Sequence, residues 1–412
     1  MTDAAISTSE RDPVAEPTPV RTSDRLFSLD VVRGFAVLGI LAVNAITFGM
    51  PEPVMMNPSL QPGGLEGEAA AAWQAMYVFF QDKMRTLFSM LFGASIFLIG
   101  GERSDLTRGK LLRKRLFWLG LFGLAHGLLF WFGDILLLYA LTGLVVLLVR
   151  SWSAKRLIMV GVALNVTFSA LYVGVISLMR MAPPETLDEF GWNTTPEQLN
   201  EMIAAFQGSA VETTLTVMGN WAAAAPFMAI FFIPATAALM MIGMGLFKAG
   251  FLAGRSPAWV YGLFILLGAA AVALIWRESS AVIAGGFPLI ETMMRPANTF
   301  LAPLVSLAFA SLLILMARFG LKLILTPLAK AGQMAFTNYL SQTLIMTTIF
   351  YGGRGLGYFG QVGWPEMWLV IIGVWVVQLI WSPLWLSRFT MGPLEWVWRR
   401  LTYGKGVALR RA

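Results

Sequence analysis

Apolar runs of about 20 residues recur along the whole chain, and they restrict its fold more than any other feature of the sequence. A helix of that length spans the hydrocarbon core of a bilayer with all its backbone groups hydrogen-bonded. Hydrophobic residues make up 57% of the 412 residues and charged residues only 13%, which leaves too few polar side chains to cover a soluble core. The sequence therefore predicts an all-α, polytopic membrane helix bundle.

Ten spans are predicted, and they divide the chain into a tail, a helix-bundle domain and a C-terminal segment. Residues 1–27 are rich in Ser, Thr, Pro, Ala and charge, which predicts a disordered cytoplasmic tail. Residues 28–390 form the predicted transmembrane domain, with an outside interfacial helix at 67–82 and an outside loop at 180–221. Residues 391–412 are predicted as a cytoplasmic interfacial segment, because paired tryptophans suit the headgroup region. The spans lie near residues 29–49, 84–101, 114–132, 134–150, 157–179, 222–248, 257–276, 296–318, 331–352 and 366–388.

The lysines and arginines alternate between the two sides of this topology. The tails and loops on the side of the N-terminus carry 23 of them, whereas the opposite loops carry six. Cytoplasmic loops are enriched in Lys and Arg, so both termini are predicted to be cytoplasmic. Because the basic residues sort by membrane side, the net charge of +7 does not indicate a nucleic-acid partner.

The chain contains no cysteine and a single histidine, which restricts the chemistry it can perform. Disulfides, thiolate nucleophiles and Cys-ligated metals are excluded, and no metal site is predicted. The histidine, His126, lies about twelve residues into the span 114–132, roughly 18 Å deep and just past the bilayer midplane. An ionisable group at that depth is costly and faces a cavity or a partner. His126 therefore either has a functional role or forms a structural hydrogen bond between helices.

Asp134 follows at the predicted outer turn, eight residues after His126. On a continuous helix the two side chains would be about 12 Å apart, so Asp134 can orient the imidazole only if the turn folds back. The amides of Asn44, Asn338 and Gln342 are candidates for facing the same site, with helix–helix hydrogen bonding as the alternative.

Basic residues at the cytoplasmic boundary are candidates for binding phosphate. Arg33 is spaced i, i+3 from Asp30, so it either pairs with that carboxylate or faces a phosphate. A basic cluster precedes the span that carries His126, and it either sets topology and attracts anionic lipid or docks a nucleotide-bearing donor. Its members are Arg108, Lys110, Arg113, Lys114 and Arg115.

Five ordered segments resemble the YeiB-like family of bacterial inner-membrane proteins. They are "RLFSLDVVRGFAVLGILAVN", "LFSMLFG", "RKRLFWLGLFGLAHGLLFWFGDILLLYALTG", "GQMAFTNYLSQTL" and "GPLEWVWRRLTYG", and together they run from about residue 25 to 411. That family is grouped with a wider set of transmembrane acyltransferases. The resemblance implies a multi-pass protein of the bacterial inner membrane, a homodimer, and a histidine in a pore that promotes acyl transfer. One branch of that set carries Arg, ten residues and then His in its first span; here Arg33 is followed eleven positions later by Asn44.

The resulting hypothesis is a membrane acyltransferase that moves an acyl group from cytoplasmic acyl-CoA, such as acetyl-CoA, to an acceptor. The acceptor would be a hydroxyl or amine of an envelope carbohydrate or lipid, and no tightly bound cofactor is expected. His126 would act as general base with Asp134 as its partner, or would form an acyl-imidazole. Arg33 and the basic cluster would hold the CoA phosphates. The three amides would polarise the carbonyl or position the acceptor.

Two other functions remain open. One is a secondary transporter or a lipid or solute flippase, for which paired broken helices would be typical. The other is a non-catalytic membrane scaffold that binds lipids or partner proteins. The sequence shows no internal repeat that favours the transporter.

Overall fold

The computed structural model describes residues 27–181, 183, 194–404 and 406–411, so most of the predicted disordered tail lies outside the described residues. The described part of the chain is helical and contains no strand. The predicted all-α bundle is confirmed. Seven stretches are long and apolar enough to cross a membrane, and three shorter or more polar helices coincide with the remaining predicted spans.

Each predicted span overlaps a helix. The ten helices are α1 (Phe27–Gly49), α4 (Lys83–Gly100), α5 (Leu106–Leu129), α6 (Leu136–Val146), α7 (Ala154–Leu178), α11 (Ile233–Lys248), α12 (Ala258–Ala284), α14 (Pro296–Arg318), α16 (Ala335–Phe350) and α17 (Trp364–Arg388). Shorter elements connect or extend them: α2 (Pro53–Met56), η2 (Pro58–Leu60), α3 (Gly67–Phe79), η3 (Leu147–Val149), η4 (Met179–Met181), α9 (Pro196–Gln207), α10 (Ala210–Phe227), η5 (Met228–Phe232), α13 (Leu289–Met294), α15 (Lys322–Gln333), η6 (Gly352–Arg354) and α18 (Pro393–Tyr403). The span predicted at 222–248 contains the end of α10, the π-helical turn η5 and α11.

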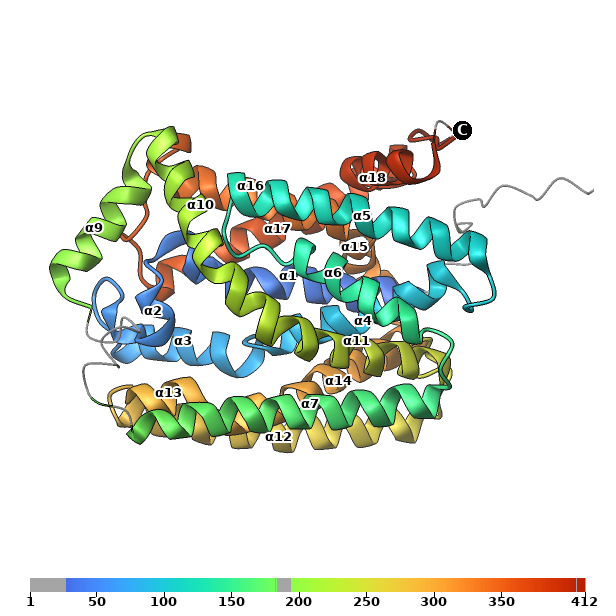
Figure 1. Cartoon of the computed structure of the whole chain (residues 1–412), viewed down its shortest axis with the longest axis horizontal. Coiled ribbons are helices and arrows are strands. Elements are labelled where there is room, and N and C mark those ends of the chain that lie inside the picture. Colours follow the sequence, from blue (N-terminus) through green and yellow to red (C-terminus); the bar gives the residue numbers. More distant parts are fainter. Residues whose placement is uncertain (1–26, 182, 184–193, 405, 412) are drawn as a thin grey trace, which may run out of the picture.

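Helix α1 runs through the middle of the bundle, and α7 and α12 lie along one edge (Figure 1). Most of α1 is buried, whereas α7 and α12 expose most of their apolar side chains, as expected where helices face lipid. Helix α1 packs tightly against α15, because Gly34 and Gly332 leave no room for a Cβ between the two backbones. This close crossing brings Asp30 and Arg33 next to Gln333.

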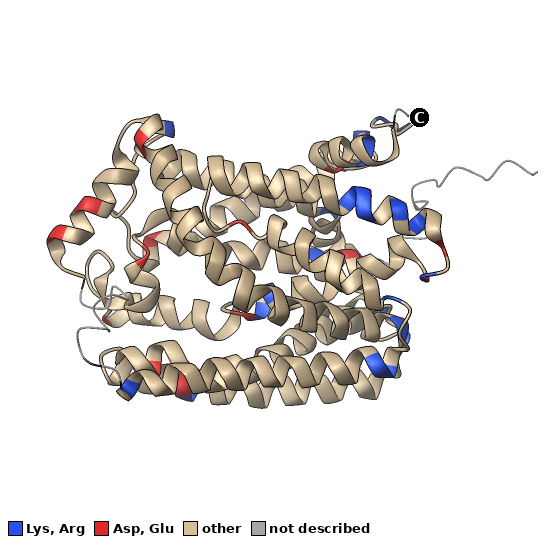
Figure 2. Ribbon diagram, viewed as in Figure 1, with Lys and Arg blue, Asp and Glu red and all other residues tan. Residues whose placement is uncertain are grey.

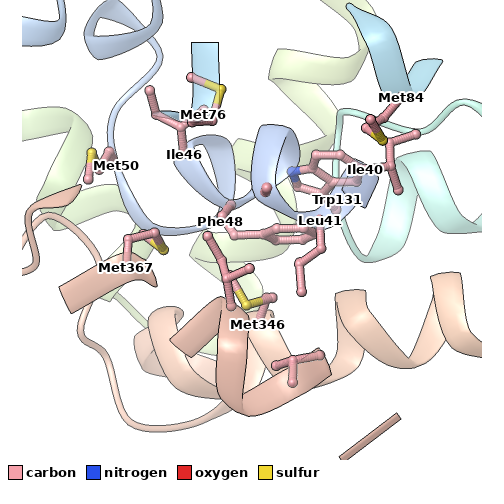
Figure 3. Packing of buried hydrophobic residues seen from close by; sticks show 14 of the residues in the cluster. Ile40, Leu41, Ile46, Phe48, Met50, Met76, Met84, Trp131, Met346 and Met367 are labelled. Atoms are coloured by element: carbon pink, nitrogen blue, oxygen red, sulfur yellow. The ribbon is translucent and has the colours of Figure 1, made fainter. Parts of the chain in front are cut away.

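The central core joins α1 to the turn that follows α5. Figure 3 shows Trp131 of that turn beside Ile40, Leu41 and Phe48 of α1. The Trp131 and Phe48 rings stack with centroids 4.3 Å apart, and both side chains are almost fully buried. The turn after α5 is therefore anchored inside the bundle.

Two predicted segments differ from what the structure shows. The predicted interfacial helix at 67–82 is α3, whose Trp73, Met76 and Tyr77 are buried, and which packs on α12 and α17. Helix α9 and the first part of α10, which begins at Ala210, lie within the predicted outside loop at 180–221, so much of that loop is helical. Residues 182 and 184–193 of that loop lie outside the described residues.

The charged residues separate toward the two ends of the bundle (Figure 2). Lys and Arg gather where α4 joins α5, on the first turns of α5 and at the end of α11, and we call this the basic end. Acidic residues are prominent at the opposite end, on α9 and α10. The separation matches the pattern from which cytoplasmic termini are predicted, and that orientation stays a prediction.

Candidate functional site

The turn between α5 and α6 folds back on α5 and brings Asp134 to His126. Both Phe130 and Trp131 donate their backbone N–H to the His126 carbonyl, which ends the helix with a tight turn. One Asp134 oxygen then accepts a hydrogen bond from the Leu137 amide at the start of α6, at 2.9 Å. The other lies 2.8 Å from His126 Nδ1. The condition under which Asp134 can orient the imidazole is therefore met.

Gly123 makes this fold-back possible. A Cβ at this position would lie 2.8 Å from Asp134 Oδ2 and would collide with the Leu137 amide nitrogen. Gly120, one turn earlier on the same helix, has only ordinary contacts, the nearest being the Ala140 Cβ at 3.5 Å. The small residue at 123 thus serves the Asp134 turn specifically.

The second nitrogen of the imidazole is also hydrogen-bonded. His126 Nε2 lies 2.9 Å from Thr343 Oγ1 on α16. An ionised carboxylate only accepts hydrogen bonds, so Nδ1 carries the proton toward Asp134 and, in the neutral ring, Nε2 accepts from the Thr343 hydroxyl. His126 is 3% exposed and Asp134 1% exposed. The order carboxylate, imidazole, hydroxyl is the one in which an imidazole base activates a hydroxyl.

A cavity of about 280 Å³ runs from the basic end toward this group. Its lining follows α1 from Leu29 to Ile40 and α5 from Leu112 to Leu119, one turn short of Gly123. The lining is polar where it includes Asp30, Arg33, Arg115, Gln333, Glu395 and Arg399. Farther in, it is apolar and aromatic and ends at Tyr139 and Tyr339. The cavity therefore suits an amphipathic ligand whose charged part stays at the basic end.

Tyr339 separates the cavity from His126. It lines the cavity, and its ring centroid is 5.5 Å from that of the imidazole. His126 itself is not among the lining residues. Tyr339 and Thr343 are spaced i, i+4 on α16, so they present one face of that helix to α5. Tyr339 therefore lies beside both the cavity and the imidazole.

Helix α18 covers the polar part of the cavity. Glu395 accepts hydrogen bonds from the Phe336 and Thr337 amides, at 2.8 and 3.0 Å, and so caps the start of α16. Burial raises the pKa of Glu395, although these hydrogen bonds oppose the shift. The Trp398 indole donates to the Arg115 carbonyl at 3.0 Å and lies under the Arg115 guanidinium, 4.1 Å from ring centroid to Cζ.

Of the basic residues singled out in the sequence, only Arg33 and Arg115 line the cavity. Arg33 pairs with Asp30 at 2.9 Å, the first of the two arrangements considered for it. Arg108 donates to the Ile99 and Leu98 carbonyls and closes the end of α4. The other three members of the cluster are exposed at the basic end: Lys110, Arg113 and Lys114.

The three predicted amides do not contact His126. Asn338 donates to Ala331 O and Ser382 Oγ and accepts from the Trp381 indole at 2.8 Å. Gln342 donates to Val37 O at 3.0 Å and to Gln378 Oε1 at 2.9 Å. Both are buried and join α16 to its neighbours.

The third amide, Asn44, lies on α1 and does not line the cavity; the backbone carbonyl of Asn44 accepts from the Thr47 hydroxyl. The predicted role of Asn44, Asn338 and Gln342 in polarising the carbonyl or positioning the acceptor stays a prediction. The sequence reasoning did not identify Thr343, Tyr339 or Glu395. All three lie in motifs quoted above. Tyr339 directly follows Asn338, and Thr343 directly follows Gln342.

Comparison with known proteins finds relatives that match over most of the chain and a family model that matches part of it. The chain is 33% identical over 396 residues to the uncharacterized protein YeiB of Escherichia coli (strain K12), covering 92% of this chain and 96% of that protein. It is 29% identical over 413 residues to the uncharacterized protein YxaH of Bacillus subtilis (strain 168), covering 93% and 96%. A family model described as a protein of unknown function (DUF418) matches residues 246–405. No solved structure matches.

Proposed function

The chain belongs to the YeiB-like family of membrane proteins, and we propose that it is an integral-membrane acyltransferase that uses acyl-CoA. The observation that carries the proposal is the buried Asp134–His126 pair, which lies next to a cavity that runs from the basic end. Buried ionisable groups inside a membrane bundle mark functional sites more often than structural ones. The proposed location is the bacterial inner membrane, with the basic end in the cytoplasm.

His126 acts as the general base in this proposal. Its Nε2 takes the proton from the acceptor hydroxyl or amine as that group attacks the thioester carbonyl. The carbon–sulfur bond then breaks, and the CoA thiolate takes the proton back from the imidazolium. Asp134 holds the Nδ1 proton and stabilises the imidazolium between these steps. The Thr343 hydroxyl, 2.9 Å from Nε2, marks the position that the acceptor would take over.

The cavity is the proposed donor site. A volume of about 280 Å³ is close to the smallest of ordinary ligand pockets, and its narrow apolar part suits a pantetheine arm and a short acyl chain. Arg33, Arg115 and Arg399 line its polar part, where the CoA phosphates would lie. Lys110, Arg113 and Lys114 are exposed at the same end and would attract the donor over a longer range.

Acyl transfer by the purified protein tests the proposal. The full-length chain in nanodiscs is incubated with radiolabelled acetyl-CoA and an extract of envelope lipids and glycans. Label should enter the extract with wild-type protein and with Arg180→Gln, an exposed arginine remote from the cavity. His126→Ala should lose transfer, and an unchanged rate in this variant excludes the proposed role.

A secondary transporter or flippase is the second candidate, and interrupted helices favour it. The helical conformation is interrupted at Asp82, between α3 and α4, and at Arg295, between α13 and α14. The π-helical turn η5 lies between α10 and α11. Transporters build their sites at such breaks. Accumulation of a labelled solute or lipid in proteoliposomes without any acyl donor would favour this function.

A further inference from the structure

A second group of charged side chains lies away from the cavity, where α3 and α4 meet α12 and α14. Lys83 is fully buried and donates from Nζ to the Tyr77 carbonyl at 2.8 Å and to the Asn298 side chain. Asn298 in turn donates to Asp82 at 2.7 Å. None of the charged residues of this group lines the larger cavity.

Basic side chains outnumber acidic ones in this group. The basic residues are Lys83, Arg85 and Arg295, and the carboxylates are Asp82 and Glu278. Glu278 is committed to the start of α14, where it accepts from the Ala297 and Asn298 amides at 2.6 and 3.0 Å. A guanidinium stays charged in a protein, and a charge inside a membrane bundle is costly, so an anion beside Arg295 would stabilise the group.

The backbone around the group is unusual. Among the described residues, the only non-glycine residues with positive φ are Asp82, Phe287 and Arg295. Asp82 and Arg295 are the breaks before α4 and α14, and Phe287 precedes α13 with its ring edge against Trp73. Left-handed backbone at such residues is uncommon and concentrates at ligand sites.

A small pocket of about 120 Å³ adjoins the break at Arg295. Arg295 lines it together with Tyr77, Tyr172, Gln81 and the methionines Met76 and Met293. The Arg295 guanidinium interacts electrostatically with the Tyr172 hydroxyl, which itself donates to the Met293 carbonyl at 2.7 Å. Arg295 Nε is buried and has no hydrogen-bond partner within the described part of the chain. Arg295 therefore lies on the pocket wall and also has a buried Nε donor that no described group satisfies.

We propose that this pocket binds a phosphate-type oxyanion through Arg295, independently of the acyltransferase function. The planar guanidinium matches two oxygens of one phosphate, and the added charge offsets that of Arg295. The volume is about four times the ~30 Å³ share of a water molecule, so it accepts one oxyanion and excludes a nucleotide. The methionine side chains in the pocket wall favour a phosphate that is attached to apolar chains. We therefore propose a lipid headgroup, in preference to free phosphate, as the ligand.

Binding to the full-length protein in neutral detergent tests the inference. Three radiolabelled probes are compared by equilibrium dialysis: inorganic phosphate, dioctanoyl phosphatidic acid and, as the control without a phosphate, dioctanoylglycerol. Wild type should bind phosphatidic acid at least tenfold more tightly than dioctanoylglycerol. Arg295→Gln should weaken that binding at least tenfold, whereas Arg255→Gln, an exposed arginine between α11 and α12 that does not line the pocket, should bind as wild type.

Met293→Trp is the second variant, because it fills the pocket and keeps the arginine. Met293→Trp should also lose phosphatidic acid binding, and it tests the proposed site if Arg295→Gln does not fold. Binding of inorganic phosphate as tight as that of phosphatidic acid would identify free phosphate as the source of the same group. Wild-type protein that binds neither, or either folded variant binding as wild type, would overturn the proposal.

Discussion

Two groups of ionisable side chains lie inside the same bundle, and they differ in how completely the protein satisfies them. Around His126, both imidazole nitrogens and both Asp134 oxygens have partners, which are each other, Thr343 and the Leu137 amide. Around Arg295, basic side chains outnumber carboxylates. Arg295 Nε and Arg85 Nη1 have no hydrogen-bond partner among the residues that the structure describes.

The difference indicates how each group would meet a ligand. A complete network fixes the geometry of its members, and a ligand enters only by replacing one of them. At His126 the exchangeable member is the neutral Thr343, because removing Asp134 would leave a buried imidazole without its carboxylate. An incomplete network takes up a ligand by addition. Substitutions at His126 should therefore change rates, and those at Arg295 should change binding.

Removal of the imidazole should have the largest effect. His126→Ala is expected to lower acyl transfer by about 10²- to 10⁴-fold, because it removes the imidazole that takes the proton from the acceptor. Asp134→Asn should also lower the rate strongly, since an amide cannot stabilise the imidazolium. Initial rates with radiolabelled acetyl-CoA measure both. Phosphatidic acid binding at Arg295 should be unchanged in both variants, and its loss would show that the two groups are coupled.

Gly123→Ala should disrupt the His126 group without removing any of its members. The added methyl meets the Asp134 carboxylate and the Leu137 amide, so the turn must move. Overpacking of this kind costs about 1–3 kcal/mol. The thermal midpoint in detergent should fall and acyl transfer should drop with it. Gly120→Ala is the matched control, because its methyl meets only the Ala140 Cβ at ordinary distance. Equal effects of the two variants would contradict the specific role of Gly123.

Substitutions in the proposed donor site should change the KM for acetyl-CoA. Arg33→Gln and Arg115→Gln each remove a guanidinium from the polar part of the cavity, and each should raise the KM for acetyl-CoA by about tenfold. Lys114→Gln removes an exposed charge at the same end and should have a smaller effect, one that disappears at high salt. A larger effect of Lys114→Gln would place the donor phosphates on the exposed cluster instead.

Helix positions were predictable here because membrane spans are long apolar runs, and each one overlaps a helix. The start of α10 was missed because Thr, Glu and Asn in residues 210–221 make that stretch look like a loop. Helix breaks were missed as well. Lys83 and Arg85 resemble loop charges in the sequence, and only the left-handed backbone at Asp82 turns α4 so that Lys83 is buried.

The candidate site was predictable in its histidine and unpredictable in its partners. A lone histidine in an apolar span is conspicuous, but the Asp134 contact depends on how Trp131 anchors the turn against Phe48. On α16, the flagged amides bind neighbouring helices, whereas Thr343, one position beyond Gln342, contacts His126. Neighbouring positions on a helix face different elements, and which face meets α5 is a property of tertiary packing.

The smallest effect is expected at Glu395, where α18 docks on α16. Burial raises the pKa of this carboxyl above its ordinary 4.5, so its contribution to stability is complete below pH 4.5 and is lost as the pH rises through the raised value. The thermal midpoint of wild type should therefore fall relative to that of Glu395→Gln as the pH increases from about 4 to 8. Glu201→Gln, an exposed carboxyl on α9, should keep the wild-type pH dependence. Parallel curves for wild type and Glu395→Gln would mean that folding does not shift the pKa of this carboxyl, and would contradict the proposed effect of its burial.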